Sequence, residues 1–197
     1  MKKTIFIFVN GILTKPADAD NWNGKAVTWT HLHTPHRAEK IEYYVGPISR
    51  VLGQKKRSAK LAKTLRFYDR DDWRIVLAGH SNGGNVICNA LKESTRSVLD
   101  RIDAIHLIAP ASEADFDKNG LNDVGAPVRV YIGTRDRALK ISSSFGRLLG
   151  YGSLGKDGPQ NVRLSDIRTV FEDYEHGEWF SDQNLDDTLK LITGHAA

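Results

Sequence analysis

The residue best suited to nucleophilic chemistry lies in a glycine-rich hexapeptide at residues 79–84. Its sequence is GHSNGG, in which Ser81 is the serine of a G-x-S-x-G pattern. A serine on a sharp turn between a buried strand and a helix presents its hydroxyl outward, usually with strained backbone angles. Gly79 and Gly83 would let that strand and helix approach closely. The pattern therefore indicates a nucleophilic serine, against the alternative of a glycine-rich turn with an incidental serine.

A serine hydroxyl is a poor nucleophile without a base, and the base needs a carboxylate that orients it. Asp136 follows an apolar stretch at residues 128–132, and His176 follows another at residues 167–171. The chain order of serine, aspartate and histidine is the order that accompanies this kind of turn. We therefore expect Ser81, Asp136 and His176 to form a catalytic triad.

Other residues of the same types are alternatives for these roles. Asp173 and Asp115 are the next carboxylates to consider if Asp136 only supports a turn. His195 is a poorer base because we expect fraying at that position, and we expect the side chain of His80 to point toward packing. Three more histidines lack a strong metal-site spacing and are expected at the surface or at a pocket rim: His31, His33 and His36.

Short β-branched apolar runs alternate with helical or loop segments and predict the elements that must position these side chains. The expected strands are residues 4–9, 41–45, 74–78, 105–109, 128–132 and 167–171. Helical spacing is seen at residues 58–65 and again after Ser81. Such an alternation indicates an α/β fold, a three-layer sandwich around a mainly parallel sheet of about six strands. Ligands of such sheets bind beyond the carboxyl ends of the strands, where Ser81, Asp136 and His176 are expected.

Composition limits the class of protein. The 197 residues fit one domain, residues 1–197, with 40% hydrophobic and 26% charged residues. A single cysteine excludes an internal disulfide, and we expect no metal and no nucleic-acid partner at a net charge of +4. No apolar run is long enough to span a bilayer. The apolar run at residues 4–9 is short for a signal peptide, so a buried first strand and a cytoplasmic protein are expected.

Taken together, the serine turn and the placement of the acid and the histidine resemble the α/β-hydrolase family over nearly the whole chain. The resemblance is to small members without a large cap, such as minimal lipases and cutinase-like esterases. It implies backbone N–H donors to an oxyanion from Asn82 and from Ile12, in a loop after the first strand that is often written H-G-x. Here that loop reads Asn10-Gly11-Ile12, so Asn10 departs from the common histidine while Gly11 is kept.

Three further features lie outside these motifs, and two of them have more than one interpretation. Residues 14–40 are expected to form a long loop, in which Trp22 and Trp29 either form the floor of a substrate pocket or cover the sheet edge. The basic run KKR at residues 55–57, continued by Lys60, Lys63 and Arg66, either favours an anionic substrate or surface or is a solvated helix face. Cys88 is expected to be an inert core thiol.

The function predicted from these residues is a lipase-like serine hydrolase that cleaves small carboxylic esters through an acyl-enzyme and needs no cofactor. A triad does not choose the leaving group, so a thioesterase or an amidase is the alternative within the enzyme class. From another class, the chain could be an inactive binding protein with a hydrolase fold. A dinucleotide-binding function is not supported, because no G-x-G-x-x-G follows a strand.

Overall fold

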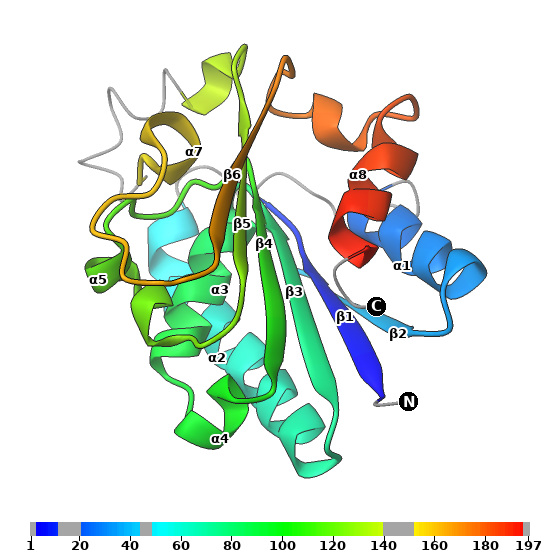
Figure 1. The fold of residues 1–197 in the computed structure, drawn as a ribbon, viewed down its shortest axis with the longest axis vertical. Helices are drawn as coiled ribbons and strands as arrows, with labels where there is room; N and C mark the ends of the chain where they lie inside the picture. The colour runs from blue at the N-terminus through cyan, green and yellow to red at the C-terminus, as the bar shows by residue number, and fades with distance from the viewer. Residues whose placement is uncertain (1–2, 12–20, 44–48, 140–151, 195–197) are drawn as a thin grey trace.

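The computed structural model describes residues 3–11, 21–43, 49–139 and 152–194. Six strands form one sheet in the order β2-β1-β3-β4-β5-β6, and every neighbouring pair is parallel (Figure 1). The strands are β1 (Thr4–Val9), β2 (Arg37–Ile41), β3 (Arg74–His80), β4 (Ile102–Ile108), β5 (Val128–Gly133) and β6 (Ile167–Glu172). The carboxyl ends of all six strands therefore lie along one edge of the sheet.

Helices cover both faces of the sheet. The helices α2 (Ser49–Arg70) and α3 (Asn82–Lys92) lie on one face, and α1 (Trp22–His33) and α8 (Leu185–Thr193) lie on the other (Figure 1). Short helical segments complete the described chain: α4 (Arg96–Leu99), α5 (Phe116–Asn119), η1 (Leu121–Asp123), α7 (Leu154–Asp157) and η2 (Glu178–Phe180). None of the helices in the described ranges is both long and apolar enough to cross a membrane.

The strand β1 shows why the sequence folds into three layers. All six of its side chains are buried, and alternate residues enter two separate hydrophobic clusters. Ile5 and Ile7 pack toward α2 and α3, whereas Phe6 and Phe8 pack toward α1 and α8. Such a continuous apolar run is typical of a strand that is covered on both faces.

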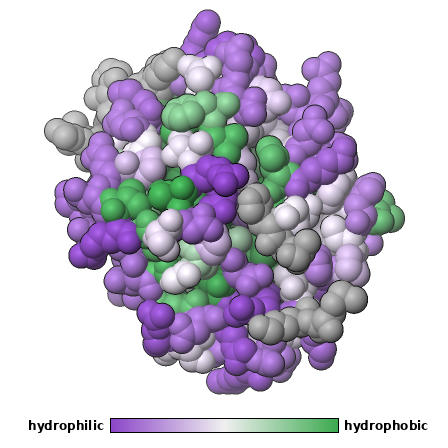
Figure 2. All heavy atoms as spheres, viewed as in Figure 1, coloured by the Kyte–Doolittle hydropathy of each residue, from purple (hydrophilic) through white to green (hydrophobic). Residues whose placement is uncertain are grey.

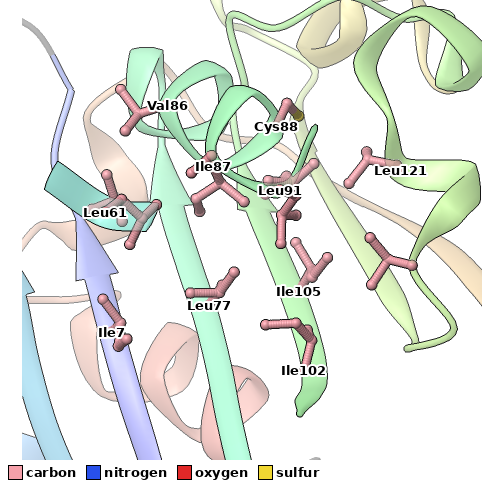
Figure 3. Packing of buried hydrophobic residues seen from close by; sticks show 14 of the residues in the cluster. Ile7, Leu61, Leu77, Val86, Ile87, Cys88, Leu91, Ile102, Ile105 and Leu121 are labelled. Atoms are coloured by element: carbon pink, nitrogen blue, oxygen red, sulfur yellow. The ribbon is translucent and has the colours of Figure 1, made fainter. Parts of the chain in front are cut away.

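The helix α3 is amphipathic, and its apolar side packs on the sheet. Figure 3 shows Ile87 and Leu91 of this helix above Leu77 of β3 and Ile105 of β4. Burial of such side chains contributes about 1.5–3 kcal/mol each. This packing fixes the direction in which α3 leaves β3, and so fixes the turn at Ser81.

The strand β6 lies at the edge of the sheet opposite β2. Its side chains are half-buried or exposed, and Phe171 is 64% exposed. Figure 2 shows the molecule from the same side as Figure 1. Hydrophobic residues are visible on that side among largely hydrophilic ones.

The predicted α/β class and parallel sheet are confirmed, but two element predictions are wrong. The second strand is β2 at Arg37–Ile41 rather than residues 41–45, of which 44 and 45 lie outside the described residues. The described part of the expected loop, residues 21–40, contains α1. At a sheet edge, β2 exposes Arg37 and keeps the side chains of Glu39 and Lys40 only half-buried, so charged residues mask its apolar alternation. The helix α1 is rich in tryptophan, threonine and histidine, which gives it little helical periodicity.

Candidate active site

Ser81 occupies a strained turn between β3 and α3. Its backbone angles are φ 55° and ψ −121°, a region that side-chain-bearing residues rarely adopt. The surrounding backbone fixes this conformation, since the Ser81 N–H donates to the Ile108 carbonyl at 2.9 Å and the Ser81 carbonyl accepts from Ala111 at 3.0 Å. Strain of this kind is typical of functional turns that present a side chain.

Glycines allow the close approach that the turn requires. A Cβ on Gly83 would lie 2.2 Å from the Val9 carbonyl oxygen, and a Cβ on Gly79 would lie 2.6 Å from Cδ1 of Ile87. Both distances are far below van der Waals contact. The predicted reason, close approach of β3 and α3, is therefore confirmed for Gly79, whereas Gly83 lets α3 approach β1.

Asp136 and His176 come together at the carboxyl edge of the sheet. Asp136 lies just beyond β5 and is only 2% exposed, and His176 lies in the loop after β6. The His176 Nδ1–H donates to Oδ2 of Asp136 at 2.7 Å. The other carboxylate oxygen, Oδ1, accepts from the backbone N–H of Leu139 at 2.9 Å. Asp136 is thus held on both sides, and a neutral His176 ring that donates through Nδ1 has Nε2 as its acceptor nitrogen.

The loop that carries His176 is tied to the end of β5. The N–H of Thr134 donates to the Glu172 carbonyl at 2.9 Å, and the Arg135 guanidinium donates to the Asp173 carbonyl at 2.7 Å. A Cβ on Gly133 would lie 2.4 Å from the Tyr174 carbonyl oxygen. Only glycine at residue 133 therefore lets the loop lie this close to β5.

His80 connects the serine turn to the histidine loop. Its Nε2–H donates to the backbone carbonyl of His176 at 2.9 Å, and the two imidazole rings are 4.8 Å apart between centroids. Burial, with a further contribution from electrostatic repulsion by His176, lowers the pKa of His80 to about 3. His80 therefore stays neutral near pH 7 and acts as a hydrogen-bond donor. The expectation that His80 points toward packing omitted this contact, which no sequence pattern indicates.

The Ser81 hydroxyl lies against the loop after β1. A Cβ built on Gly11 would be 3.1 Å from Cβ of Ser81 and 3.6 Å from its Oγ. No hydrogen bond joins Ser81 Oγ to His176, both of which lie in the described ranges. Hydrogen bonds of catalytic groups are often long without substrate and shorten when it binds.

The expected oxyanion loop is described only in part. Asn10 is fully buried, and its carbonyl accepts a hydrogen bond from the Tyr43 hydroxyl at 2.5 Å. Tyr43 therefore fixes the peptide unit that leads into Gly11, a role that the sequence did not indicate. Ile12 lies outside the described residues. Asn82 is buried at the start of α3, directly after Ser81.

The alternative carboxylates are engaged elsewhere. The side chain of Asp173 is 79% exposed and pairs with Arg135 at 3.1 Å. The side chain of Asp115 caps α5 by accepting from the N–H of Asp117 at 3.0 Å. His195 lies outside the described residues. Of the candidate acids in the described part of the chain, Asp136 is the one bonded to His176.

The two tryptophans of α1 have different surroundings. Trp22 stacks on Phe180 at 4.0 Å between ring centroids and meets His80 edge-on at 6.1 Å. Trp29 donates to Asp186 of α8 at 2.8 Å, so it joins the two helices on that face. Trp22 is therefore beside the serine turn, and a pocket role for either tryptophan stays a prediction.

The remaining residues singled out from the sequence lie at the surface or in the hydrophobic core. His31 and His33 are exposed, while His36 is half-buried against Phe6. Cys88 is buried in the core, and burial raises the pKa of its thiol to about 12, so the reactive thiolate is disfavoured. Within the described ranges, no cluster of three or more histidine, cysteine, aspartate or glutamate side chains is arranged to hold a metal ion.

The fold and this arrangement of residues define an α/β hydrolase. Residues 24–166 match the sequence family described as alpha/beta hydrolase of unknown function (DUF900), and the chain belongs to that family. The match includes Ser81 and Asp136 but ends before His176. A comparison with curated proteins gives no match.

Solved structures with the same fold share little sequence with this chain. A candidate hydrolase from Agrobacterium vitis S4 has a TM-score of 0.66 at 12% identity over 99% of this chain and 88% of that chain. Est1E from Butyrivibrio proteoclasticus has a TM-score of 0.59 at 14% identity, over 99% of this chain and 89% of its own. A hyperthermophilic esterase from Pyrobaculum calidifontis has a TM-score of 0.59 at 13% identity, over 98% of this chain and 76% of that chain. At these identities the likeness shows the fold alone.

Proposed function

We propose that this α/β hydrolase cleaves carboxylic esters through a Ser-His-Asp triad and an acyl-enzyme intermediate. The observation that carries the proposal is the 2.7 Å hydrogen bond between Asp136 and His176, beside a serine with positive φ. The names of two proteins with the same fold, Est1E and the Pyrobaculum esterase, agree with ester hydrolysis, and Est1E has also been solved with ferulic acid bound.

The chemistry follows from the positions of the ring nitrogens of His176. Because Nδ1 donates to Asp136, Nε2 is the atom that accepts the proton of the Ser81 hydroxyl. The Ser81 oxygen attacks the ester carbonyl, and the tetrahedral intermediate collapses when His176 returns the proton to the leaving alcohol. Water then attacks the acyl-enzyme, His176 takes the water proton, and the acid leaves as Ser81 regains its hydrogen. Asp136 stabilises the imidazolium in both halves of the reaction.

The negative charge of the tetrahedral intermediate would be stabilised by backbone amides. Asn82 follows the nucleophile at the start of α3, where the helix dipole favours an anion. The loop at Gly11 lies against the Ser81 side chain from the other side, which supports Ile12 as the second donor. Loss of one such donor costs about 10²–10³ in kcat in comparable sites.

The experiment that tests the reaction class compares matched ester, thioester and amide substrates with the same acyl group. We expect the highest kcat/KM on the ester and no turnover of any substrate by Ser81→Ala. Ser153→Ala, at a serine on another loop, is the matched control and should keep full activity. A preference for the thioester or the amide would change the substrate class, and tight binding without turnover would indicate a binding protein.

A further inference from the structure

The solvent-exposed side of α2 carries a concentration of positive charge. We define the basic face of α2 as the exposed side chains Lys55, Lys56, Lys60, Lys63, Arg66 and Arg70. The helix contains no acidic residue before Asp69. These six cations exceed the net charge of +4 of the whole chain, so all other residues together carry a slight negative charge.

The cations of the basic face have no carboxylate partners among the described residues. Lys60 donates to the backbone carbonyl of Glu42 at 3.1 Å, which leaves its charge uncompensated. By contrast, other exposed arginines have carboxylate partners: Arg96 pairs with Asp100 at 2.9 Å and Arg135 with Glu178 at 2.8 Å. Like charges at helical spacing repel one another, so a solvated helix face gains nothing from this arrangement. An anionic partner would remove that cost.

An exposed aromatic ring lies within the basic face. Phe67 is 57% exposed and lies four residues after Lys63 and three before Arg70, on the same stripe of the helix. Beside it is a cavity of about 400 Å³ between α2 and β2, whose lining includes Arg37, Lys63, Phe67 and Tyr68. Glu39 also lines this cavity, where it accepts a hydrogen bond from the Tyr68 hydroxyl. The cavity therefore offers two cations and an apolar ring to one ligand, together with one carboxylate that the Tyr68 hydroxyl holds.

The opposite layer of the molecule lacks such an excess of positive charge, with three aspartates against two lysines around α8. The exposed aspartates Asp182, Asp186 and Asp187 lie at or near α8, across the sheet from α2. Only Lys25 and Lys190 form ion pairs with them in the described residues. This asymmetry would orient the protein with α2 toward a negatively charged surface.

We propose that the basic face of α2 binds the surface of a membrane that contains anionic lipids. The cations attract the phosphate headgroups, Phe67 enters the headgroup region, and Arg37 and Lys63 hold one headgroup in the cavity. A lipid surface fits better than single-stranded nucleic acid, because nucleic-acid grooves stack successive bases on several aromatic rings and this face exposes one. The face begins at the sheet edge that carries Ser81, since α2 leads back from the end of β2 to the start of β3.

The test is cosedimentation of the purified protein with vesicles. Vesicles of phosphatidylcholine alone are compared with vesicles of phosphatidylcholine and phosphatidylserine at about 7:3, at low and at high salt. We expect at least tenfold tighter binding to the anionic vesicles, and loss of that difference at high salt, because the interaction is electrostatic. Equal binding to both vesicles, or no binding, would overturn the proposal.

Variants locate the surface. The triple variant K56Q/K60Q/K63Q should bind anionic vesicles at least tenfold more weakly, and Phe67→Ala about threefold more weakly. The control K118Q/K156Q/R163Q has the same net charge as the triple variant and should bind within twofold of the unaltered protein. Equal losses in both triple variants would show that net charge, not this face, is responsible.

Further measurements distinguish membrane binding from misfolding of the variants and from nucleic-acid binding. Circular dichroism and thermal unfolding establish that each variant is folded. A single-stranded oligonucleotide added to the anionic vesicles should not displace the protein; displacement at equal phosphate concentration would assign the face to nucleic acid instead. Hydrolysis of a soluble activated ester should be unchanged in all variants, so the failure of membrane binding and the failure of the proposed esterase activity are distinguishable.

Discussion

The Nε2–H of His80 donates to the backbone carbonyl of His176 at 2.9 Å, so the residue before Ser81 holds the loop that carries His176. His80 ends β3, and His176 follows β6 at the far edge of the sheet. The contact joins two loops that meet only because all strands end at the same edge. The neutral ring of His80 also packs against Trp22 and Phe180, which hold the ring in position.

Removing this hydrogen bond should slow the reaction without weakening substrate binding. In His80→Phe the ring is kept but the donor is lost, and a net hydrogen bond of about 1 kcal/mol corresponds to about fivefold. We expect kcat to fall by about five- to tenfold with KM unchanged. His80→Gln keeps an N–H donor and should recover most of the activity. A rise in KM at constant kcat would instead assign His80 to the substrate pocket.

The lowered pKa of His80 predicts a pH dependence of stability. The unfolded chain binds a proton at this histidine below about pH 6.5, whereas the folded protein binds it only near pH 3. The free energy of unfolding should therefore decrease as pH falls from about 6.5 toward 3. Urea unfolding at pH 7 and pH 4.5 measures this, and His80→Gln should lose less stability over that interval than the unaltered protein. Parallel losses in both proteins would contradict the prediction.

Replacing Asp136 with asparagine should abolish most of the activity while the fold is kept. The amide would favour the wrong tautomer of His176, which costs roughly 10⁴ in kcat in a Ser-His-Asp site. Asp173→Asn, at the exposed carboxylate in the same loop region, is the control and should change kcat less than twofold. If Asp136→Asn loses under tenfold, the orienting carboxylate must be another residue.

The close contact between Gly133 and the Tyr174 carbonyl predicts a steric defect. In Gly133→Ala the new methyl would lie 2.4 Å from that oxygen, so the histidine loop must move. We expect a loss of about 1–3 kcal/mol in the free energy of unfolding and a reduced kcat. Gly177→Ala lies in the same loop with nothing within 4 Å of the added methyl, and it should be nearly neutral. Equal effects of the two changes would show that the clash with Tyr174 is not the cause.

The buried strands β1 and β3 could be predicted because most of their own residues are apolar. Residues 5–9 and 75–78 are continuous apolar runs, which are typical of a strand covered on both faces. The edge strand β2 mixes charged and apolar side chains, so its register could not be found from the pattern. The helix α1 could not be found because its tryptophan, threonine and histidine residues give it little helical periodicity.

The candidate site was predictable as far as chain order and strand ends determine it. Asp136 and His176 each follow an apolar run, and parallel strands bring such positions to one edge. The contacts of His80 with His176 and of Tyr43 with Asn10 depend on how separate loops pack in three dimensions. No spacing along the chain encodes those contacts, so sequence reasoning missed them.

The proposed esterase activity depends on Ser81 being a nucleophile that His176 activates. Incubation with a fluorophosphonate probe, followed by peptide mass spectrometry, examines this dependence in one experiment. We predict a single labelled peptide that contains residue 81, with labelling lost in Ser81→Ala and slowed at least a hundredfold in His176→Ala. Labelling at another residue, or an unchanged rate without the His176 imidazole, would show that Ser81 is not activated in this way.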